Sequence, residues 1–189
     1  MRKGITNKIA GTNRQKKIEV CDIQLNFLLM NCQSLKLKLD SLAKNFNENK
    51  AAFIQTTEML FKHRDPQLTS YLASMEDEFN IKCIRKDWKS GETGRAHGGV
   101  ALFFDADYCS FSKLDLTALK GQAKEFEILA CKGKLKGVKR EIVVFTCYLP
   151  PRLTKKEITD ILETLTDAVS EARAKIESPW LCIGGDFNQ

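Results

Sequence analysis

The succession of short apolar segments constrains the fold of this 189-residue chain more than any other feature. Segments of strand length, bounded by polar and turn-forming residues, lie at 25–32, 51–56, 81–85, 100–104, 109–116, 125–131, 141–147 and 180–183. Two other segments, 35–46 and 155–176, repeat apolar residues at helical spacing. This order predicts strand–helix–strand, then antiparallel strands, then helix–strand. It favours a mixed α/β layered fold over a doubly wound parallel sheet.

Local signals refine this pattern. Thr154 followed by Glu157 predicts a capping box at the start of the long helix. Residues 61–79 are ambiguous, although a helix beginning after Asp65-Pro66 would bring its apolar residues onto one face. The lysine- and glycine-rich residues 132–139 predict the turn of a hairpin, and 87–99 predict a loop. We find no internal repeat and no linker that would divide residues 21–189.

Composition excludes several classes of protein. Thirty basic against 24 acidic residues give a net charge of +6, which is compatible with a polyanionic partner but does not require one. The seven cysteines are odd in number, form no C-x-x-C pair and lie mostly in apolar runs, as is typical of reduced cysteines in an intracellular protein. No apolar run has the length of a membrane span, and no signal peptide is evident. Residues 1–20 are polar and basic, and we expect a disordered arm that contacts phosphates, directs nuclear import or is merely solvated.

Polar side chains stand where apolar strands end. They are Asn31, Glu58, Tyr148, Asp186 and Asn188. Asp186 and Asn188 would point the same way in extended chain, and the preceding Gly184-Gly185 would allow a sharp turn and close approach to a ligand. A carboxylate and a carboxamide together can hold a hard metal ion and orient a phosphate or a water molecule. Each residue also has a simpler interpretation, such as a helix cap for Asn31, a surface acid for Glu58 or a half-buried ring for Tyr148.

Five short motifs carry a resemblance to a known family. In chain order they are Asn31-Cys32-Gln33-Ser34-Leu35, Thr57-Glu58, Gly98-Gly99-Val100-Ala101, Tyr148-Leu149-Pro150-Pro151 and Gly185-Asp186-Phe187-Asn188. Their order and rough spacing resemble the endonuclease/exonuclease/phosphatase superfamily, whose fold is that of DNase I. The similarity is strongest to the apurinic-endonuclease-like domain of non-LTR retrotransposons, which is associated with reverse transcriptase. The resemblance implies a four-layer α/β sandwich with mixed, mostly antiparallel sheets.

The resemblance also implies roles for these residues in metal-dependent hydrolysis of DNA. Glu58 would bind Mg²⁺ or Mn²⁺, with Asn31 beside it in the metal shell. Tyr148 would hydrogen-bond the scissile phosphate, Asp186 would orient or deprotonate the attacking water, and Asn188 would hold a phosphate oxygen. DNA would be the partner, in an intracellular setting with the nucleus as one candidate.

Departures from the family pattern lead us to expect a fragment. The family's second half carries a further metal-site Asp and a closing Asp-His pair, which this sequence lacks. The histidines present, His63 and His97, lie in the wrong half to replace them, and Met59 stands where the family often has tryptophan. We therefore interpret 21–189 as the N-terminal portion of such a domain, truncated before its second half and inactive alone. A non-catalytic nucleic-acid-binding or interaction remnant, and a phosphoesterase of the same superfamily, remain alternatives.

Two structural expectations follow. The tips of the strands ending at Asn31, Thr56, Cys147 and Gly184 should gather on one edge of a mixed sheet. If each half of the domain supplied one of two facing sheets, one apolar sheet face would be uncovered, and the chain would self-associate through it. The residues expected on that face are Leu28, Met30, Phe53, Val144 and Leu181.

Overall fold

The computed structural model describes residues 26–33, 38–59, 66–86, 99–120 and 126–188. In chain order its elements are β1 (Phe27–Asn31), α1 (Leu39–Asn49), β2 (Phe53–Thr57), α2 (Pro66–Phe79), β3 (Ile81–Lys86), β4 (Val100–Asp105), β5 (Cys109–Lys113), the short 3-10 helix η2 (Thr117–Leu119), β6 (Glu127–Leu135), β7 (Glu141–Tyr148), α3 (Lys155–Lys175) and β8 (Trp180–Asp186). The expected arm at 1–20, the loop at 87–98 and both histidines lie outside the described residues.

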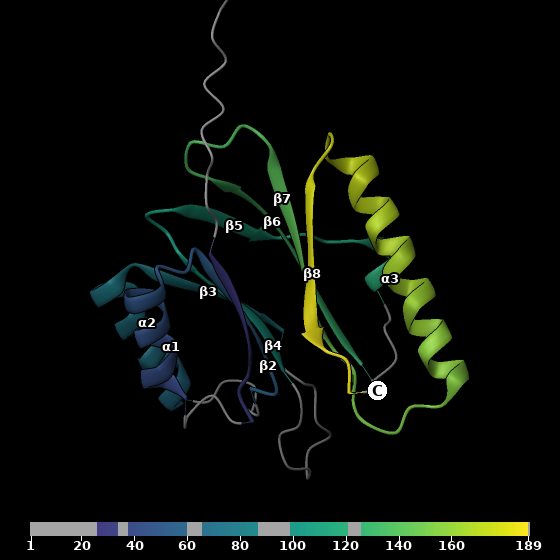
Figure 1. Ribbon diagram of the computed structural model, residues 1–189, viewed down its shortest axis with the longest axis horizontal. Coiled ribbons are helices and arrows are strands. Elements are labelled where there is room, and N and C mark those ends of the chain that lie inside the picture. The colour runs from purple at the N-terminus through teal and green to yellow at the C-terminus, as the bar shows by residue number, and fades with distance from the viewer. Residues whose placement is uncertain (1–25, 34–37, 60–65, 87–98, 121–125, 189) are drawn as a thin grey trace, which may run out of the picture.

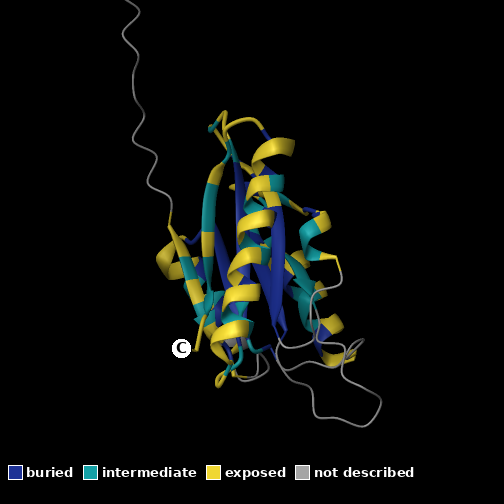
Figure 2. Ribbon diagram, turned by 90° about the vertical axis from the view of Figure 1, so that its right-hand side faces the viewer, coloured by how far each residue is buried: buried dark blue, intermediate teal, exposed yellow. Residues whose placement is uncertain are grey.

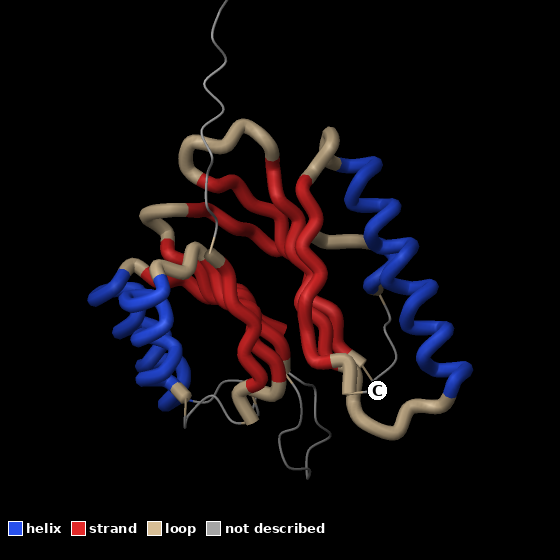
Figure 3. The backbone as a smooth tube through the Cα atoms, viewed as in Figure 1, coloured by secondary structure: helices blue, strands red, loops and turns tan. Residues whose placement is uncertain are grey.

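The strands form two sheets, with orders β1-β2-β4-β3 and β5-β6-β7-β8. Both sheets are mixed, because β1 is parallel to β2 and β7 is parallel to β8, while the remaining pairs are antiparallel. Helices α1 and α2 cover the outer face of the first sheet, and α3 covers the second (Figure 1). Helices, sheet, sheet and helix make four layers (Figure 3). The predicted fold class, a layered α/β sandwich with mostly antiparallel strands, is confirmed.

Three apolar cores fill the spaces between these layers. One lies between the first sheet and helices α1 and α2, and a second lies between the second sheet and α3. The third lies between the two sheets and includes Phe53 and Val144, which are 0% and 1% exposed. The expectation that these two residues would lie on an uncovered sheet face is therefore wrong. Both facing sheets are built from this chain, so each covers the other.

Several element boundaries differ from those predicted. Helix α1 begins at Leu39 rather than residue 35 and continues to Asn49. Strand β5 ends at Lys113, and β6 continues to Leu135 instead of turning at residue 132. Exposed Lys132 alternates with buried Gly133 and Leu135, so its charge marks the solvated face of a strand rather than a turn. The capping box is confirmed: the Thr154 hydroxyl accepts from Glu157 N, and Thr154 N donates to Glu157 Oε2.

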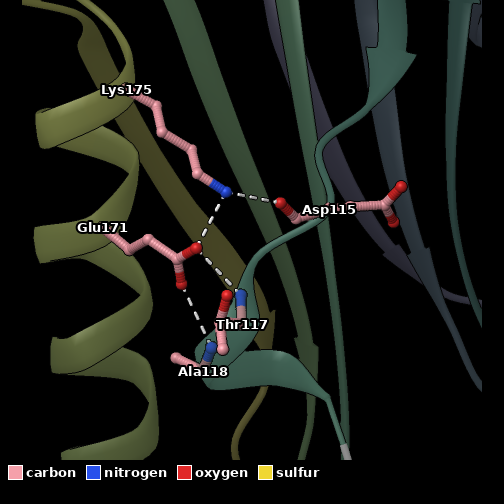
Figure 4. Close-up of polar contacts among 5 residues, drawn as sticks. All are labelled: Asp115, Thr117, Ala118, Glu171 and Lys175. Carbon is pink, nitrogen blue, oxygen red and sulfur yellow. Dashed lines mark hydrogen bonds and ion pairs between the residues drawn. The ribbon is translucent and has the colours of Figure 1, made fainter.

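Polar contacts anchor the last turns of α3 to the segment that follows β5 (Figure 4). The Glu171 carboxylate accepts hydrogen bonds from the backbone N–H groups of Thr117 and Ala118 at 2.9 and 3.1 Å. Lys175 Nζ lies 2.8 Å from Glu171 Oε1 and donates to Asp115 O. The hydrogen bond from Lys175, followed by those from the two backbone N–H groups, lowers the pKa of Glu171 to about 2. The contacts fix α3 against the sheet at a solvent-accessible position.

Strands β1 and β8 are the edges of their respective sheets and lie beside one another (Figure 1). Along these edges Phe27 and Leu29 are each 50% exposed, and Ile183 is 45% exposed. In Figure 2 the strands behind α3 are largely buried, whereas the edge at the left of the view is half-buried to exposed. The exposed apolar residues therefore lie on strand edges, where backbone N–H and C=O groups can pair with another strand, and not on an uncovered sheet face. Within the described residues, no helix is both long and apolar enough to span a membrane.

Candidate functional site

The candidate site lies where four strands, two from each sheet, end at one corner of the sandwich. Asn31 is the last residue of β1, and Glu58 immediately follows β2. Tyr148 and Asp186 are the last residues of β7 and β8, where they pair in register. Parallel neighbours within each sheet bring their tips to the same edge, and packing of the sheets brings the two edges together. The expected gathering of tips occurs, although they come from two sheets rather than one.

A direct hydrogen bond joins the two halves of this corner. Asn31 Nδ2 donates to Asp186 Oδ2 at 2.5 Å. The other end of the Asn31 amide, Oδ1, accepts from Gln33 N at 3.1 Å. The amide is held from both ends, so its nitrogen is aimed at the carboxylate. The simpler interpretation of Asn31 as the cap of α1 is not what the structure shows, since α1 begins only at Leu39.

Tyr148 lies between the acids of the two sheets. Tyr148 is half-buried, and its hydroxyl donates a hydrogen bond to the Glu58 carboxylate. Burial, together with the negative charges of Glu58, Asp186 and Glu127, raises the pKa of Tyr148 well above its usual range. The hydroxyl therefore stays protonated and remains a hydrogen-bond donor at any physiological pH.

Left-handed backbone positions flank the site. Gln33, Glu58 and Asn188 have φ values of 43°, 52° and 37°. Such conformations are uncommon for residues other than glycine, and they concentrate at functional sites. At Glu58 the reversal ends β2 and lets Met59, only 1% exposed, enter the core while the carboxylate reaches Tyr148.

Two expectations about the last strand are corrected by the structure. Gly184 and Gly185 lie inside β8 and make no sharp turn. A Cβ at Gly184 would lie 2.5 Å from Gln55 Oε1, and one at Gly185 would overlap Cys147 O, so close packing of strands requires both glycines. The chain from Asp186 to Asn188 is not extended as expected. The backbone N of Asn188 donates to Asp186 Oδ1, and Asn188 Nδ2 donates to Leu149 O.

Two polar residues near the site were missed by the sequence analysis. Gln55 is 1% exposed and crosses between the sheets, where Nε2 donates to Phe145 O at 2.9 Å and to Thr146 Oγ1 at 3.2 Å. Glu127 is 3% exposed, pairs with Tyr148 in register and accepts from Gly99 N at 2.6 Å. Gln55 lies within β2 and Glu127 begins β6, each next to apolar residues, and this was the available signal, because a buried polar side chain needs a partner.

The donors at this corner suit one kind of cation. Glu58 and Asp186 offer carboxylates, and Asn31 offers an amide oxygen. Among the described residues, no group of three or more His, Cys, Asp or Glu side chains could hold a metal ion by itself. Mg²⁺ suits such a sparse set, since it is usually held by one or two carboxylates together with water and substrate phosphate.

Comparison with known proteins finds similarity in structure but not in sequence. No protein-family profile and no curated protein sequence matches the chain. A 3′ phosphatase from Neisseria bound to a product DNA hairpin superposes with a TM-score of 0.59 at 15% identity, over 87% of this chain and 58% of its own. A mannosyl-6-phosphatase from Bacteroides thetaiotaomicron superposes with a TM-score of 0.63 at 13% sequence identity, over 87% of this chain and 66% of its own.

An endonuclease/exonuclease/phosphatase family protein from Bacteroides thetaiotaomicron gives a TM-score of 0.59 at 14% identity, over 82% of this chain and 56% of its own. The chain shares its layered α/β sandwich with these three solved structures, and this likeness confirms the predicted fold. The chain spans 56% to 66% of the lengths of the three.

Proposed function

We propose that this chain supplies the Asn31, Glu58, Tyr148 and Asp186 portion of a metal-dependent hydrolase that cleaves phosphodiester bonds in DNA. The observation that carries the proposal is the Asn31–Asp186 hydrogen bond, which joins the sheets beside the Tyr148–Glu58 pair. It creates one corner that holds a fixed carboxylate, a protonated hydroxyl and a second carboxylate. Phosphodiester hydrolysis needs these functions together.

Asp186 is the group that would position the attacking water and accept its proton. One carboxylate oxygen is occupied by the Asn31 amide and the other by Asn188 N, so the carboxylate cannot rotate freely. A fixed acceptor orients a water molecule better than a mobile one, and positioning of this kind contributes much of the effect of a general base.

Tyr148 and Asn188 would contact the phosphate. The raised pKa of Tyr148 keeps its hydroxyl protonated, and the proton that it now donates to Glu58 would pass to a phosphate oxygen once Glu58 binds the metal ion. Asn188 Nδ2 uses one hydrogen on Leu149 O and retains the other for a second phosphate oxygen. Donors aimed at developing negative charge stabilise the transition state of hydrolysis.

Glu58 and the Asn31 amide oxygen would hold a single Mg²⁺ or Mn²⁺ at the other side of the phosphate. When bound, such an ion neutralises phosphate charge and stabilises the leaving oxygen. With only these protein donors, much of its coordination would come from water and from the substrate.

Cleavage would need groups beyond these residues. The resemblance places a closing Asp-His pair in the second half of the family domain, and no motif of this sequence matches that pair. General acid–base catalysis is typically worth about 10²–10⁴-fold. We therefore expect negligible cleavage by the 189-residue chain and recovery when the family's second half is supplied in cis.

The test is a nicking assay on plain and abasic duplex DNA with Mg²⁺ or Mn²⁺, using the 189-residue chain and the extended form. Nicking by the extended form should be abolished by Glu58→Gln or Asp186→Asn and preserved by Asp115→Asn, a control at an exposed position. Robust cleavage by the 189-residue chain, lost on Asp186→Asn, would refute the need for a second half. No cleavage by any form would favour a non-catalytic nucleic-acid-binding remnant.

A small-molecule phosphoesterase is the second candidate, favoured by the superposition on a mannosyl-6-phosphatase. Release of phosphate from sugar phosphates, without DNA nicking, would distinguish it. Origin in a retrotransposon reading frame rests on the motif resemblance alone. A downstream frame with reverse-transcriptase motifs would support it, and an authentic stop codon would favour the remnant.

A further inference from the structure

A second region of this chain carries the features of a nucleic-acid-binding surface, far from the corner at Asp186. We call it the basic hairpin surface, and define it by Tyr108, Ser110, Ser112, Lys132, Lys134 and Lys136. It lies at the opposite end of the second sheet from Tyr148, because β7 runs from the β6–β7 hairpin to the site. Lys132, the member nearest the site, pairs with Val143, so at ~3.3 Å per residue it lies about 16 Å along the strand from Tyr148, and Lys134 and Lys136 lie farther.

Strand pairing places the lysines of this surface on one face. Lys132 pairs with Val143 and Lys134 with Glu141, while the alternating Cys131 and Leu135 enter the core between the sheets. Lys132 and Lys134 thus project from the outer face of β6, and both are exposed. They lie across from β5, whose Ser110 and Ser112 pair with Lys134 and Lys132. Ammonium and hydroxyl groups therefore alternate across two neighbouring strands.

The hairpin between β6 and β7 carries charges of almost one sign only, the positive. Residues 132–140 contain four lysines and Arg140 and no acid. Glu141 follows, and its carboxylate lies 3.9 Å from Lys134 Nζ, in a contact where the lysine side chain is 66% exposed. A long, exposed ion pair of this kind contributes little and leaves the lysine available to another anion.

The surface is also hollowed. Two depressions of about 340 and 220 Å³ adjoin there, and they share Ser110 and Lys134 in their walls. Tyr108 lines the larger one and is 57% exposed, with Lys136 beside it. The acid in that wall is Asp107. Its carboxylate accepts a hydrogen bond from Asn80 Nδ2 at 2.9 Å, so one of its oxygens already has a hydrogen-bond partner.

We propose that the basic hairpin surface binds single-stranded nucleic acid. Phosphates would contact Lys132, Lys134 and Lys136 and the serine hydroxyls, and a base would stack on Tyr108. Lysines that follow a backbone, interleaved with an exposed aromatic ring, are the combination by which proteins bind single strands without reading sequence. The surface needs neither metal nor Asp186, so the proposal goes beyond the proposed hydrolysis and stands without it.

The test is the salt dependence of binding of the full 189-residue chain to a fluorescent single-stranded oligothymidylate, measured by anisotropy in EDTA. The variant Lys132→Gln/Lys134→Gln/Lys136→Gln removes three charges from the surface. The matched control, Lys44→Gln/Lys50→Gln/Lys120→Gln, removes three exposed lysines elsewhere. Each lost phosphate contact lowers the slope of log K against log salt by about 0.7 on a single strand. We expect a reduction of about 2 for the surface variant and little change for the control.

Tyr108→Ser tests the stacking contact. It should weaken oligothymidylate binding by about fivefold or more, while weak duplex binding through the lysines is unchanged. Equal salt slopes for the surface and control variants would overturn the proposal. A lower slope with no effect of Tyr108→Ser would overturn the single-strand assignment.

Discussion

Asn31 and Asp186 lie 155 positions apart in the sequence, and their side chains form a 2.5 Å hydrogen bond. Asn31 ends β1 of the first sheet, and Asp186 ends β8 of the second. Neither strand pairs with the other through its backbone, since they belong to different sheets. The hydrogen bond therefore depends on how the sheets are packed. Substitutions at the interface between the sheets should change the distance between these two side chains.

Removal of the Asn31 amide should release Asp186. Asn31→Ala deletes the donor to Oδ2, and we expect cleavage by the extended form to fall by about 10–100-fold, as is typical when a partner that orients an active group is lost. The measurement is the single-turnover rate of nicking. Asn45→Ala, which removes an amide on the exposed face of α1, is the control. Parent-like rates for Asn31→Ala would show that the contact has no role in cleavage.

Gln55 should be important for the stability of the interface between the sheets. Gln55→Leu removes hydrogen bonds to Phe145 O and Thr146 Oγ1, and the loss of each such hydrogen bond costs about 0.5–1.5 kcal/mol. Urea denaturation should show a lower free energy of unfolding with an unchanged m-value. Thr56→Val, which removes one longer 3.4 Å contact from the same strand, should cost less. Equal losses in the two variants would contradict the bridging role.

Removal of the Glu58 charge should change the pKa of Tyr148. Glu58 contributes to the raised pKa of Tyr148 both by its charge and by its hydrogen bond. Glu58→Gln should therefore lower the pKa of Tyr148, although burial will keep it above the usual value. Absorbance of tyrosinate at alkaline pH, in a background with Tyr71→Phe and Tyr108→Phe, isolates this group. An unchanged titration would mean that the two side chains do not meet in solution.

Glu171 should make stability depend on pH at the acid end. Its pKa falls from 4.5 to about 2 in the folded chain, so its contribution is fully present above the unfolded value and is lost as pH falls toward 2. Denaturation from pH 6 to 2 should show Glu171→Gln less stable than the parent at the upper end, with the difference shrinking below the unfolded pKa. Glu163→Gln on the same helix is the control. A difference independent of pH would contradict the carboxylate network in Figure 4.

The edges formed by β1 and β8 should promote self-association. Phe27 and Leu29 on one edge and Ile183 on the other expose apolar side chains, and these edges pair with no further strand among the described residues. Light scattering after size exclusion should detect oligomers of the 189-residue chain, and Leu29→Lys/Ile183→Lys should shift it toward monomer. Tyr108→Lys, at an exposed apolar residue away from these edges, should not. A compact monomer with no dye-binding surface would contradict this prediction.

The apolar patterns determined the elements of the structure. Strands at the expected positions, the helix α3 with its Thr154–Glu157 cap, and the layered α/β class all follow from local spacing, because period and capping act within a few residues. The polar residues at the strand tips were also evident, since a polar side chain that follows a buried strand stands out from its neighbours. These are properties that the chain carries before it folds.

Tertiary structure alone decided how these elements meet. The sequence did not show that one chain builds both facing sheets, so Phe53 and Val144 were wrongly expected to be uncovered. Nor did it show that Gly184 and Gly185 give room to Gln55 and Cys147 rather than to a ligand. Contacts between residues far apart in sequence depend on sheet order and packing, which no local pattern encodes. The Asn31–Asp186 pair exists because two separate sheets end at the same corner.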